Sequence, residues 1–277
     1  MGPGRPEHPG IAAVDDMQFD WQFFWQSLFT PTDRFLDGLV LTIAISVVAM
    51  ILAIITGLAI ALMRRSRIAA VRWVAGVYIW AIRGTPLLVQ LVLIYTGFAA
   101  VGLYQFDDVS LLGLSVKAAV QAAILGLMIN ESAYIAEIVR AGLDAVPKGQ
   151  FEAAASLGMR PGKLMRWIIV PQSLRVMVPP LGNSFNGMMK TTSILSVIGV
   201  SEMFQVTQSI SSATFHTFEI FIVVAIYYLA LTTVWTVIQS AIENRLARQV
   251  GIEQPVRITQ RLLGARRSVA ASQPAHE

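Results

Sequence analysis

The chain has 277 residues, of which 55% are hydrophobic and 14% are charged, whereas an average soluble domain carries about a quarter charged residues. A soluble fold needs a polar surface that this composition hardly supplies, so we expect apolar surface to face lipid. The net charge of +4 comes from Lys and Arg clusters between apolar segments, which favours membrane topology over nucleic-acid binding. With no Cys, the sequence excludes disulfides and thiolate metal sites, and its three scattered His residues argue against metal chemistry.

Residues 1–33 are expected to form an external, partly disordered N-terminal tail. Its basic start is not followed by the apolar core of a secretory signal. The tail ends in the aromatic residues Trp21, Phe23, Phe24 and Trp25. Two interpretations stay open, a disordered tail and an aromatic anchor at the membrane interface.

The first predicted span covers residues 38–63, which are 26 residues without a charge, more than the roughly 20 needed to cross the hydrocarbon core. A basic cluster follows directly, at Arg64, Arg65, Arg67 and Arg72. Because positive residues concentrate on the cytoplasmic side, this end of the span is predicted to be cytoplasmic.

A second apolar run covers residues 84–106, between Arg83 and an acidic loop that starts at Asp107. Thr85 and Pro86 suit an N-cap and a first helical residue. A helix that begins there leaves Arg83 at the cytoplasmic interface, whereas a helix that begins near Trp73 buries it. We favour the first interpretation because it needs no buried charge.

The third predicted span, residues 116–143, contains ionisable and polar residues, and these are Asn130, Glu131, Tyr134, Glu137 and Arg140. At helical spacing Asn130, Tyr134 and Glu137 share one face, with Glu131 beside it. Since a charge inside the membrane is costly, this stripe is predicted to line a path. The alternatives are that Glu131 is protonated or paired within the bundle, and that Glu137 and Arg140 form an ion pair.

The fourth predicted span, residues 172–198, contains Pro179, Pro180 and Lys190, so we expect a broken or bent helix. Irregular backbone inside a membrane suits a pathway, although Lys190 can also extend to the outer interface. A loop is expected at residues 201–216, followed by a last span at residues 220–242.

Five spans place the N-terminus outside and the C-terminus in the cytoplasm, and every basic cluster is then cytoplasmic. Residues 251–277 are polar and basic, and we expect a disordered cytoplasmic tail there.

The polar segment 144–171 is predicted to be cytoplasmic and carries a spaced motif: Glu152, Ala153, Ala154, Gly158, Ile168 and Pro171. It resembles the EAA motif of bacterial ABC importer permeases, in which E-A-A is followed by G after three residues and by I-x-L-P after nine more. Only Val170 departs from that pattern, over 20 residues.

Three further strings resemble the polar amino acid permeases of that superfamily, and these are Arg83-Gly84-Thr85-Pro86, Asn130-Glu131-Ser132-Ala133-Tyr134 and Lys190-Thr191-Thr192-Ser193. The resemblance implies an all-α membrane domain of the type I ABC importer arrangement over residues 34–250, with about five transmembrane helices. It also implies a cytoplasmic coupling helix between spans 3 and 4, at about residues 150–157. The alternative without a docking role is that this segment is only a helical hairpin loop, whose alanines reflect helix propensity.

The resemblance further implies partners: a dimer of ABC ATPase subunits, a second permease subunit, identical or homologous, and an external solute-binding protein. The chain contains no G-x-x-x-x-G-K-[ST] string, so we expect ATP and Mg to be bound by the ATPase, with no catalytic residue or cofactor in this chain. The expected location is the bacterial inner membrane.

An amino acid carries an ammonium and a carboxylate, and both need partners when dehydrated. Glu131 is predicted to accept the ammonium. Residues predicted to meet the carboxylate are Arg83, Lys190, Thr191, Thr192 and Ser193. Opines are a further substrate class that fits the resemblance.

A secondary transporter or channel with Glu131 as a proton site is the alternative function, and it leaves the EAA segment unexplained. A membrane-embedded enzyme is disfavoured, since no Ser/His/Asp set or H-E-x-x-H string appears.

Overall fold

The computed structural model describes residues 19–111 and 114–248, so the predictions for residues 1–18 and 249–277 lie outside the described residues. Within these ranges the chain is almost wholly helical, and its short hairpin pairs β1 (Val109–Leu111) antiparallel with β2 (Leu114–Val116). The longer helices are α1 (Trp21–Phe29), α2 (Asp33–Arg64), α3 (Ala69–Arg83), α6 (Ala118–Asp144), α7 (Lys148–Ser156), α9 (Val170–Thr191), α10 (Met203–Thr214) and α11 (Thr217–Arg248). The predicted all-α class is confirmed.

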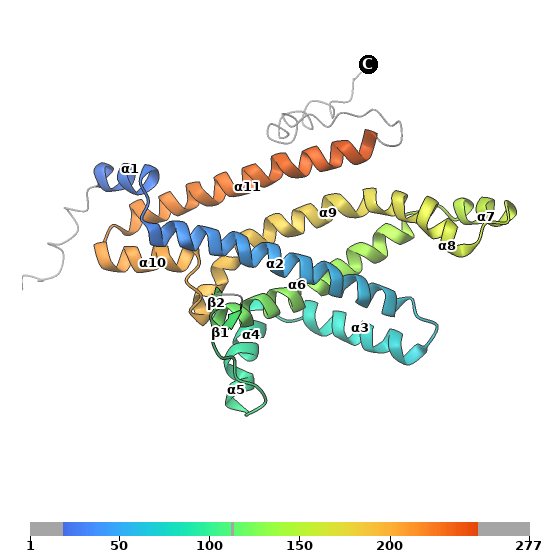
Figure 1. Cartoon of the computed structure of the whole chain (residues 1–277), viewed down its shortest axis with the longest axis horizontal. Helices are drawn as coiled ribbons and strands as arrows, with labels where there is room; N and C mark the ends of the chain where they lie inside the picture. Colours follow the sequence, from blue (N-terminus) through green and yellow to red (C-terminus); the bar gives the residue numbers. More distant parts are fainter. Residues whose placement is uncertain (1–18, 112–113, 249–277) are drawn as a thin grey trace, which may run out of the picture.

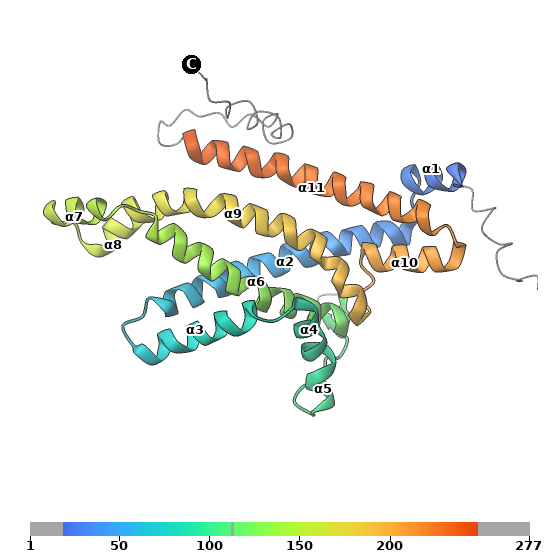
Figure 2. The ribbon, with the colours of Figure 1, turned by 180° about the vertical axis from the view of Figure 1, so that it is seen from behind.

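Four helices, α2, α6, α9 and α11, run along the length of the molecule (Figure 1). The turn from α2 to α3 lies toward the same end as α7 and the short α8 (Pro161–Leu164), while α1 and α10 lie at the opposite end, and Figure 2 shows the same arrangement from behind. The basic cluster and the EAA segment therefore lie toward one end, as the predicted topology requires. Their orientation in the membrane stays a prediction.

Among the described residues, three helices are long and apolar enough to cross a membrane alone: α2, α6 and residues 217–246 of α11. The bent pair of α3 and residues 87–100 is a fourth candidate. Helix α9 is not among these candidates. The count of five spans therefore stays a prediction.

Small residues allow α2 and α6 to approach closely. The face of α2 that is buried carries Ala49, Ala53 and Gly57, and a Cβ on Gly57 would lie 2.8 Å from the carbonyl oxygen of Ser132 in α6. Such contacts are how membrane helices associate, because lipid provides no hydrophobic drive between them. This pair forms the centre of the bundle and fixes the position of α6.

The favoured interpretation of residues 84–106 is right that a helix begins after Pro86, but it misses the helix that comes before. Helix α3 ends at Arg83; α4 (Leu87–Val92), whose N-cap is Pro86, a π-helical turn (Leu93–Gly97) and α5 (Phe98–Ala100) then continue at 105° to it. The depth of Arg83 in a membrane stays a prediction. Pro86 provides no N–H and disfavours helical backbone at Thr85, so it ends one helix before it starts the next.

The expected loop at residues 201–216 is also wrong, since it contains α10. The buried Glu202 caps this helix by accepting hydrogen bonds from the backbone N–H groups of Phe204 (3.0 Å) and Gln205 (2.7 Å). Glutamate is not a residue that N-cap preferences point to, which explains why the sequence did not predict it.

In the part of the N-terminal tail that the structure describes, residues 21–29 are helical. The Asp20 side chain caps α1 by accepting from the N–H of Phe23 at 2.8 Å. The Tyr227 hydroxyl of α11 donates to the carbonyl oxygen of Leu28 at 2.9 Å, which holds the helix against the bundle. Trp21 and Trp25 remain exposed, as the aromatic-anchor interpretation requires.

Helix α9 continues through Pro179 and Pro180 and changes only at Thr192, where a 3-10 helix begins (Thr192–Ile198). The predicted irregularity is thus present, but after Thr191 rather than at the prolines.

Candidate functional site: a polar cavity between α3, α6 and α9

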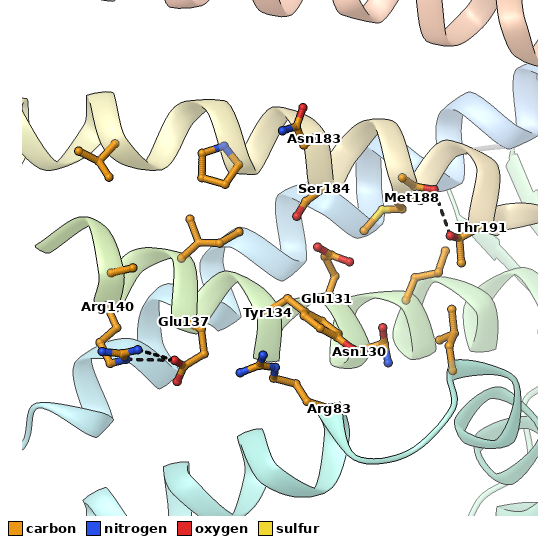
Figure 3. A pocket seen from close by; sticks show the side chains of 17 residues that line it. Arg83, Asn130, Glu131, Tyr134, Glu137, Arg140, Asn183, Ser184, Met188 and Thr191 are labelled. Atoms are coloured by element: carbon orange, nitrogen blue, oxygen red, sulfur yellow. Dashed lines mark hydrogen bonds and ion pairs between the residues drawn. The ribbon is translucent and has the colours of Figure 1, made fainter. Parts of the chain in front are cut away.

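A cavity of about 780 Å³ lies between α3, α6 and α9 (Figure 3). This volume lies within the range of small-molecule sites, roughly 300–1,000 Å³. Its polar and charged lining residues are Arg83, Asn130, Glu131, Tyr134, Glu137, Arg140, Asn183, Ser184 and Thr191. Much of this lining comes from the middle of helices that are otherwise apolar, so the cavity is a polar site within the bundle.

Arg83 reaches the cavity from the last turn of α3. Its guanidinium carbon lies 5.3 Å from the centre of the Tyr134 ring, a distance at which the cation is attracted to the ring face. Arg83 lies at the level of Tyr134, in the middle part of α6, rather than beside the basic cluster that follows α2. The break after α3 therefore places this charge at the edge of the cavity, where Arg83 is exposed in the single chain.

Glu131 lies halfway along α6, and its carboxylate is directed across the cavity toward Ser184 of α9 (Figure 3). Within the described part of the chain, neither Glu131 nor Arg83 forms an ion pair. One carboxylate and one guanidinium thus line the same cavity without a charged protein partner. The alternative that Glu131 is ion-paired within the bundle is therefore not supported by the described residues, whereas the alternative that it is protonated stays open.

The predicted pair of Glu137 and Arg140 is confirmed, with an Arg140 nitrogen 2.9 Å from a Glu137 oxygen. Arg140 also contacts Asp144 at 3.2 Å, and Asp144 contacts Arg65 of α2 at 2.9 Å. These charges satisfy one another at the end of the cavity nearer the EAA segment. They link α2 to α6 and leave Glu131 and Arg83 as the available charges.

Five of the residues predicted for the substrate path line the cavity: Arg83, Asn130, Glu131, Tyr134 and Thr191. Lys190, Thr192 and Ser193 do not. Lys190 is exposed outside the lining, Thr192 is fully buried, and the Ser193 hydroxyl donates to the carbonyl oxygen of Lys190. Their role in the path stays a prediction that this cavity does not support.

Apart from Thr191, the sequence analysis did not identify the residues of α9 that line the cavity. Pro180, Ser184, Gly187 and Thr191 line one wall, and their spacing of three or four residues places them on one helical face. This stripe of small and polar residues in a predicted span was the signal available in the sequence. It identifies the face of α9 that opposes Glu131.

The EAA segment forms the helix and turn expected from the sequence, with α7 slightly earlier than residues 150–157. Gly158 has φ +68°, a left-handed conformation that suits glycine. Glu152 and Ala153 are exposed, whereas Ala154 is buried. Ile168 is half-buried and Pro171 begins α9. Two large apolar side chains beside the motif are exposed, Leu157 at 80% and Trp167 at 71%.

Comparison with known proteins gives consistent similarities. A family model described as "binding-protein-dependent transport system inner membrane component" matches residues 49–248. The chain is 37% identical over 224 residues to the probable amino-acid permease protein YxeN of Bacillus subtilis, covering 81% of this chain and 96% of that protein. It is 38% identical over 217 residues to the octopine transport system permease protein OccM of Rhizobium radiobacter, covering 78% and 85%.

Among solved structures, the chain resembles a crystal structure of an amino acid ABC transporter with histidines. The TM-score is 0.72 at 39% identity, and the match covers 83% of this chain and 100% of that one. The region that the family model matches, residues 49–248, includes both the cavity and the EAA segment.

Proposed function

The chain belongs to the family of binding-protein-dependent transport system inner membrane components, and from this premise we propose that it is the permease subunit of an ATP-driven importer of amino acids. An external binding protein delivers the amino acid, and this chain, embedded in the bacterial inner membrane, provides its path. The relatives are amino-acid permeases, which supports the substrate class.

The observation that carries this proposal is the pairing of opposite charges in one cavity. Glu131 and Arg83 both line it, and neither has an ion-pair partner among the described residues. An amino acid brings an ammonium and a carboxylate, and each charge loses its hydration inside the bundle. Glu131 meets the ammonium and Arg83 meets the carboxylate, while Asn183, Ser184 and Thr191 provide hydrogen bonds.

ATP coupling is assigned to α7 and the turn at Gly158. The exposed Glu152 and Ala153, with the apolar Leu157 and Trp167 nearby, form a surface that docks on a cytoplasmic ATPase subunit. The ATPase dimer binds ATP and Mg, and a second permease subunit completes the path. Closure of the ATPase dimer moves α7, and α9, which follows after α8 and a π-helical turn, carries that movement to the wall of the cavity.

Opines are the second substrate class to consider, because an octopine permease is among the relatives. An opine contains the same ammonium and carboxylate pair and additional polar groups, and the cavity of about 780 Å³ is large for a single amino acid.

Uptake of a radiolabelled amino acid mixture into proteoliposomes tests the proposal. The assay uses the permease with its ATPase, external binding protein, and ATP inside the vesicles. We expect uptake that needs ATP and binding protein, persists with an uncoupler, and is competed by the cognate amino acid. Uptake abolished by the uncoupler with ATP present would instead support a gradient-driven transporter, and competition by octopine alone would support an opine.

A further inference from the structure

The turn between α2 and α3 contains four arginines and lies toward the end of the bundle that also holds α7 (Figures 1 and 2). We call residues 64–72 the basic turn, and its arginines, all of them exposed, are Arg64, Arg65, Arg67 and Arg72. No acidic residue occurs in residues 38–106. The basic turn therefore has a positive charge that the surrounding stretch of sequence does not balance.

The conformation of the basic turn is fixed by its own arginines. The Arg72 guanidinium donates through one nitrogen to the carbonyl oxygens of Ser66 and Arg67, both at 2.9 Å. The guanidinium of Arg64 lies against α3, because a Cβ on Gly76 would lie 2.7 Å from one of its nitrogens. Glycine at this position thus leaves room for a charged group, and both guanidiniums are held beside the same helix.

Three of the four arginines lack a carboxylate partner. Arg65 pairs with Asp144 of α6 at 2.9 Å. Arg64, Arg67 and Arg72 form no ion pair within the part of the chain that the structure describes. Clusters of basic residues directly beside a membrane helix attract anionic lipid headgroups. The basic turn therefore offers three unpaired cations to such a headgroup.

An exposed apolar face of α3 begins beside the basic turn. Trp73 is 70%, Val77 38% and Trp80 77% exposed, and their spacing of four and three residues places them on one side of the helix. Helix α3 is the first half of the bent pair that is apolar enough to span a membrane. Tryptophan is enriched where a bilayer meets water. The described chain leaves this face uncovered, so it is available to acyl chains.

The basic turn and the apolar face of α3 are complementary to the two parts of one molecule, an anionic phospholipid. Arginine binds phosphate oxygens through charge-assisted hydrogen bonds, and acyl chains cover apolar side chains that water hydrates poorly. A free phosphate would leave the face of α3 uncovered. A water-soluble protein partner would reach the basic turn but not the length of the helix.

We propose that an anionic phospholipid binds here, with its phosphate at the three unpaired arginines and its acyl chains along the exposed face of α3. The site lies outside the cavity, and the inference does not depend on the proposed function. Helix α3 has Arg83 in its last turn. The lipid thus holds the helix that brings this charge to the cavity.

Binding of phosphatidylglycerol to the purified full-length chain, followed by native mass spectrometry, tests the headgroup contact. The variant is Arg67→Gln, because Arg67 forms no ion pair among the described residues. The matched control is Arg65→Gln, the same change two residues away in an arginine that Asp144 already neutralises. We expect Arg67→Gln to weaken binding by about fivefold and Arg65→Gln to leave it nearly unchanged.

Equal losses in the two variants would show a diffuse effect of charge and would overturn the inference, as would no loss in Arg67→Gln. Phosphatidylethanolamine, which has no net charge, is expected to bind the natural chain more weakly, and equal binding of the two lipids would contradict the site. Displacement of phosphatidylglycerol by soluble glycerol phosphate would identify a site for free phosphate instead.

Tryptophan fluorescence tests the position of the acyl chains, because bromine atoms on a lipid chain quench a tryptophan that they contact. We expect dibrominated phosphatidylglycerol to quench the natural chain more than dibrominated phosphatidylethanolamine does at the same content. This excess is expected to be lost in Trp80→Phe and kept in Trp25→Phe, a control in α1 at the opposite end that is 49% exposed. No excess in the natural chain, or an excess that Trp80→Phe retains, would overturn the inference.

Discussion

Glu131 and Arg83 are candidates for substrate contact because both line the cavity. A charged side chain near the middle of a membrane helix costs several kcal/mol unless it is compensated. The other charged pair of the cavity, Glu137 with Arg140, is compensated within the protein at 2.9 Å. Glu131 and Arg83 have no such partner among the described residues, so we expect a dipolar substrate to compensate them.

Replacing Glu131 by Gln is expected to lower amino acid uptake by about tenfold or more, because a hydrogen bond to a charged group contributes about 1.5–3 kcal/mol. The shape of the side chain is kept, so assembly with the ATPase is expected to be unchanged. The measurement is the initial rate of ATP-driven uptake in proteoliposomes, with the amount of assembled complex determined by size-exclusion chromatography.

Glu137→Gln is the matched control, since it makes the same chemical change two turns away in the same cavity. Its pair with Arg140 is about half exposed on the arginine side, and such pairs contribute at most about 1 kcal/mol. We expect uptake close to that of the natural chain. An equal loss in both variants, or no loss in Glu131→Gln, would remove Glu131 from the substrate path.

At the scale of elements, the long apolar helices could be predicted and the breaks could not. Residues 38–63 and 220–242 identify α2 and α11 because long uncharged runs have one stable form in lipid. The string Gly84-Thr85-Pro86 serves equally well to begin or to end a helix, so the sequence alone did not reveal the corner between α3 and α4. The polar face of α6 could also be predicted from the spacing of its residues. Which face of α9 lines the cavity could not, because that depends on how α6 and α9 pack against each other.

The contact between α2 and α6 depends on the absence of a side chain at Gly57. A Cβ there would lie 2.7 Å from a Cγ of Ile135 and 2.8 Å from the backbone oxygen of Ser132. Gly57→Ala is therefore expected to destabilise the fold by about 1–3 kcal/mol, as overpacking does. The measurement is the thermal unfolding midpoint of the purified chain in detergent.

Gly187→Ala is the control for this prediction, because nothing lies within 4 Å of a Cβ at that position of α9. Alanine favours a helix over glycine, so its unfolding midpoint is expected to stay equal or to rise. A midpoint for Gly57→Ala as high as that of Gly187→Ala would show that α2 and α6 do not pack as described.

At the scale of the whole molecule, the EAA segment at one end of the bundle is linked along the chain to the cavity in its middle. The EAA segment lies between α6 and α9, the two helices that carry Glu131 and the wall opposite it. We therefore expect a movement of α7 to reach both sides of the cavity, through α6 before it and through α8 and α9 after it. The motif spacing could be read from the sequence because it is local, whereas the cavity required the tertiary arrangement.

The most direct test of coupling compares Gly158→Asp with Gly162→Asp. Both changes add the same side chain to the same segment, and nothing lies within 4 Å of either Cβ position. Of these two glycines, only Gly158 has a positive φ, a conformation in which a side chain costs about 1–2 kcal/mol. The change therefore distorts the turn after α7 without disturbing a core contact.

The deciding measurement is the ATPase activity of the chain reconstituted with its ATPase and binding protein. We expect liganded binding protein to stimulate ATP hydrolysis with the natural chain and with Gly162→Asp, and this stimulation to be lost with Gly158→Asp. Stimulation that is absent with the natural chain, or unchanged by Gly158→Asp, would contradict a permease coupled to an ATPase through this segment.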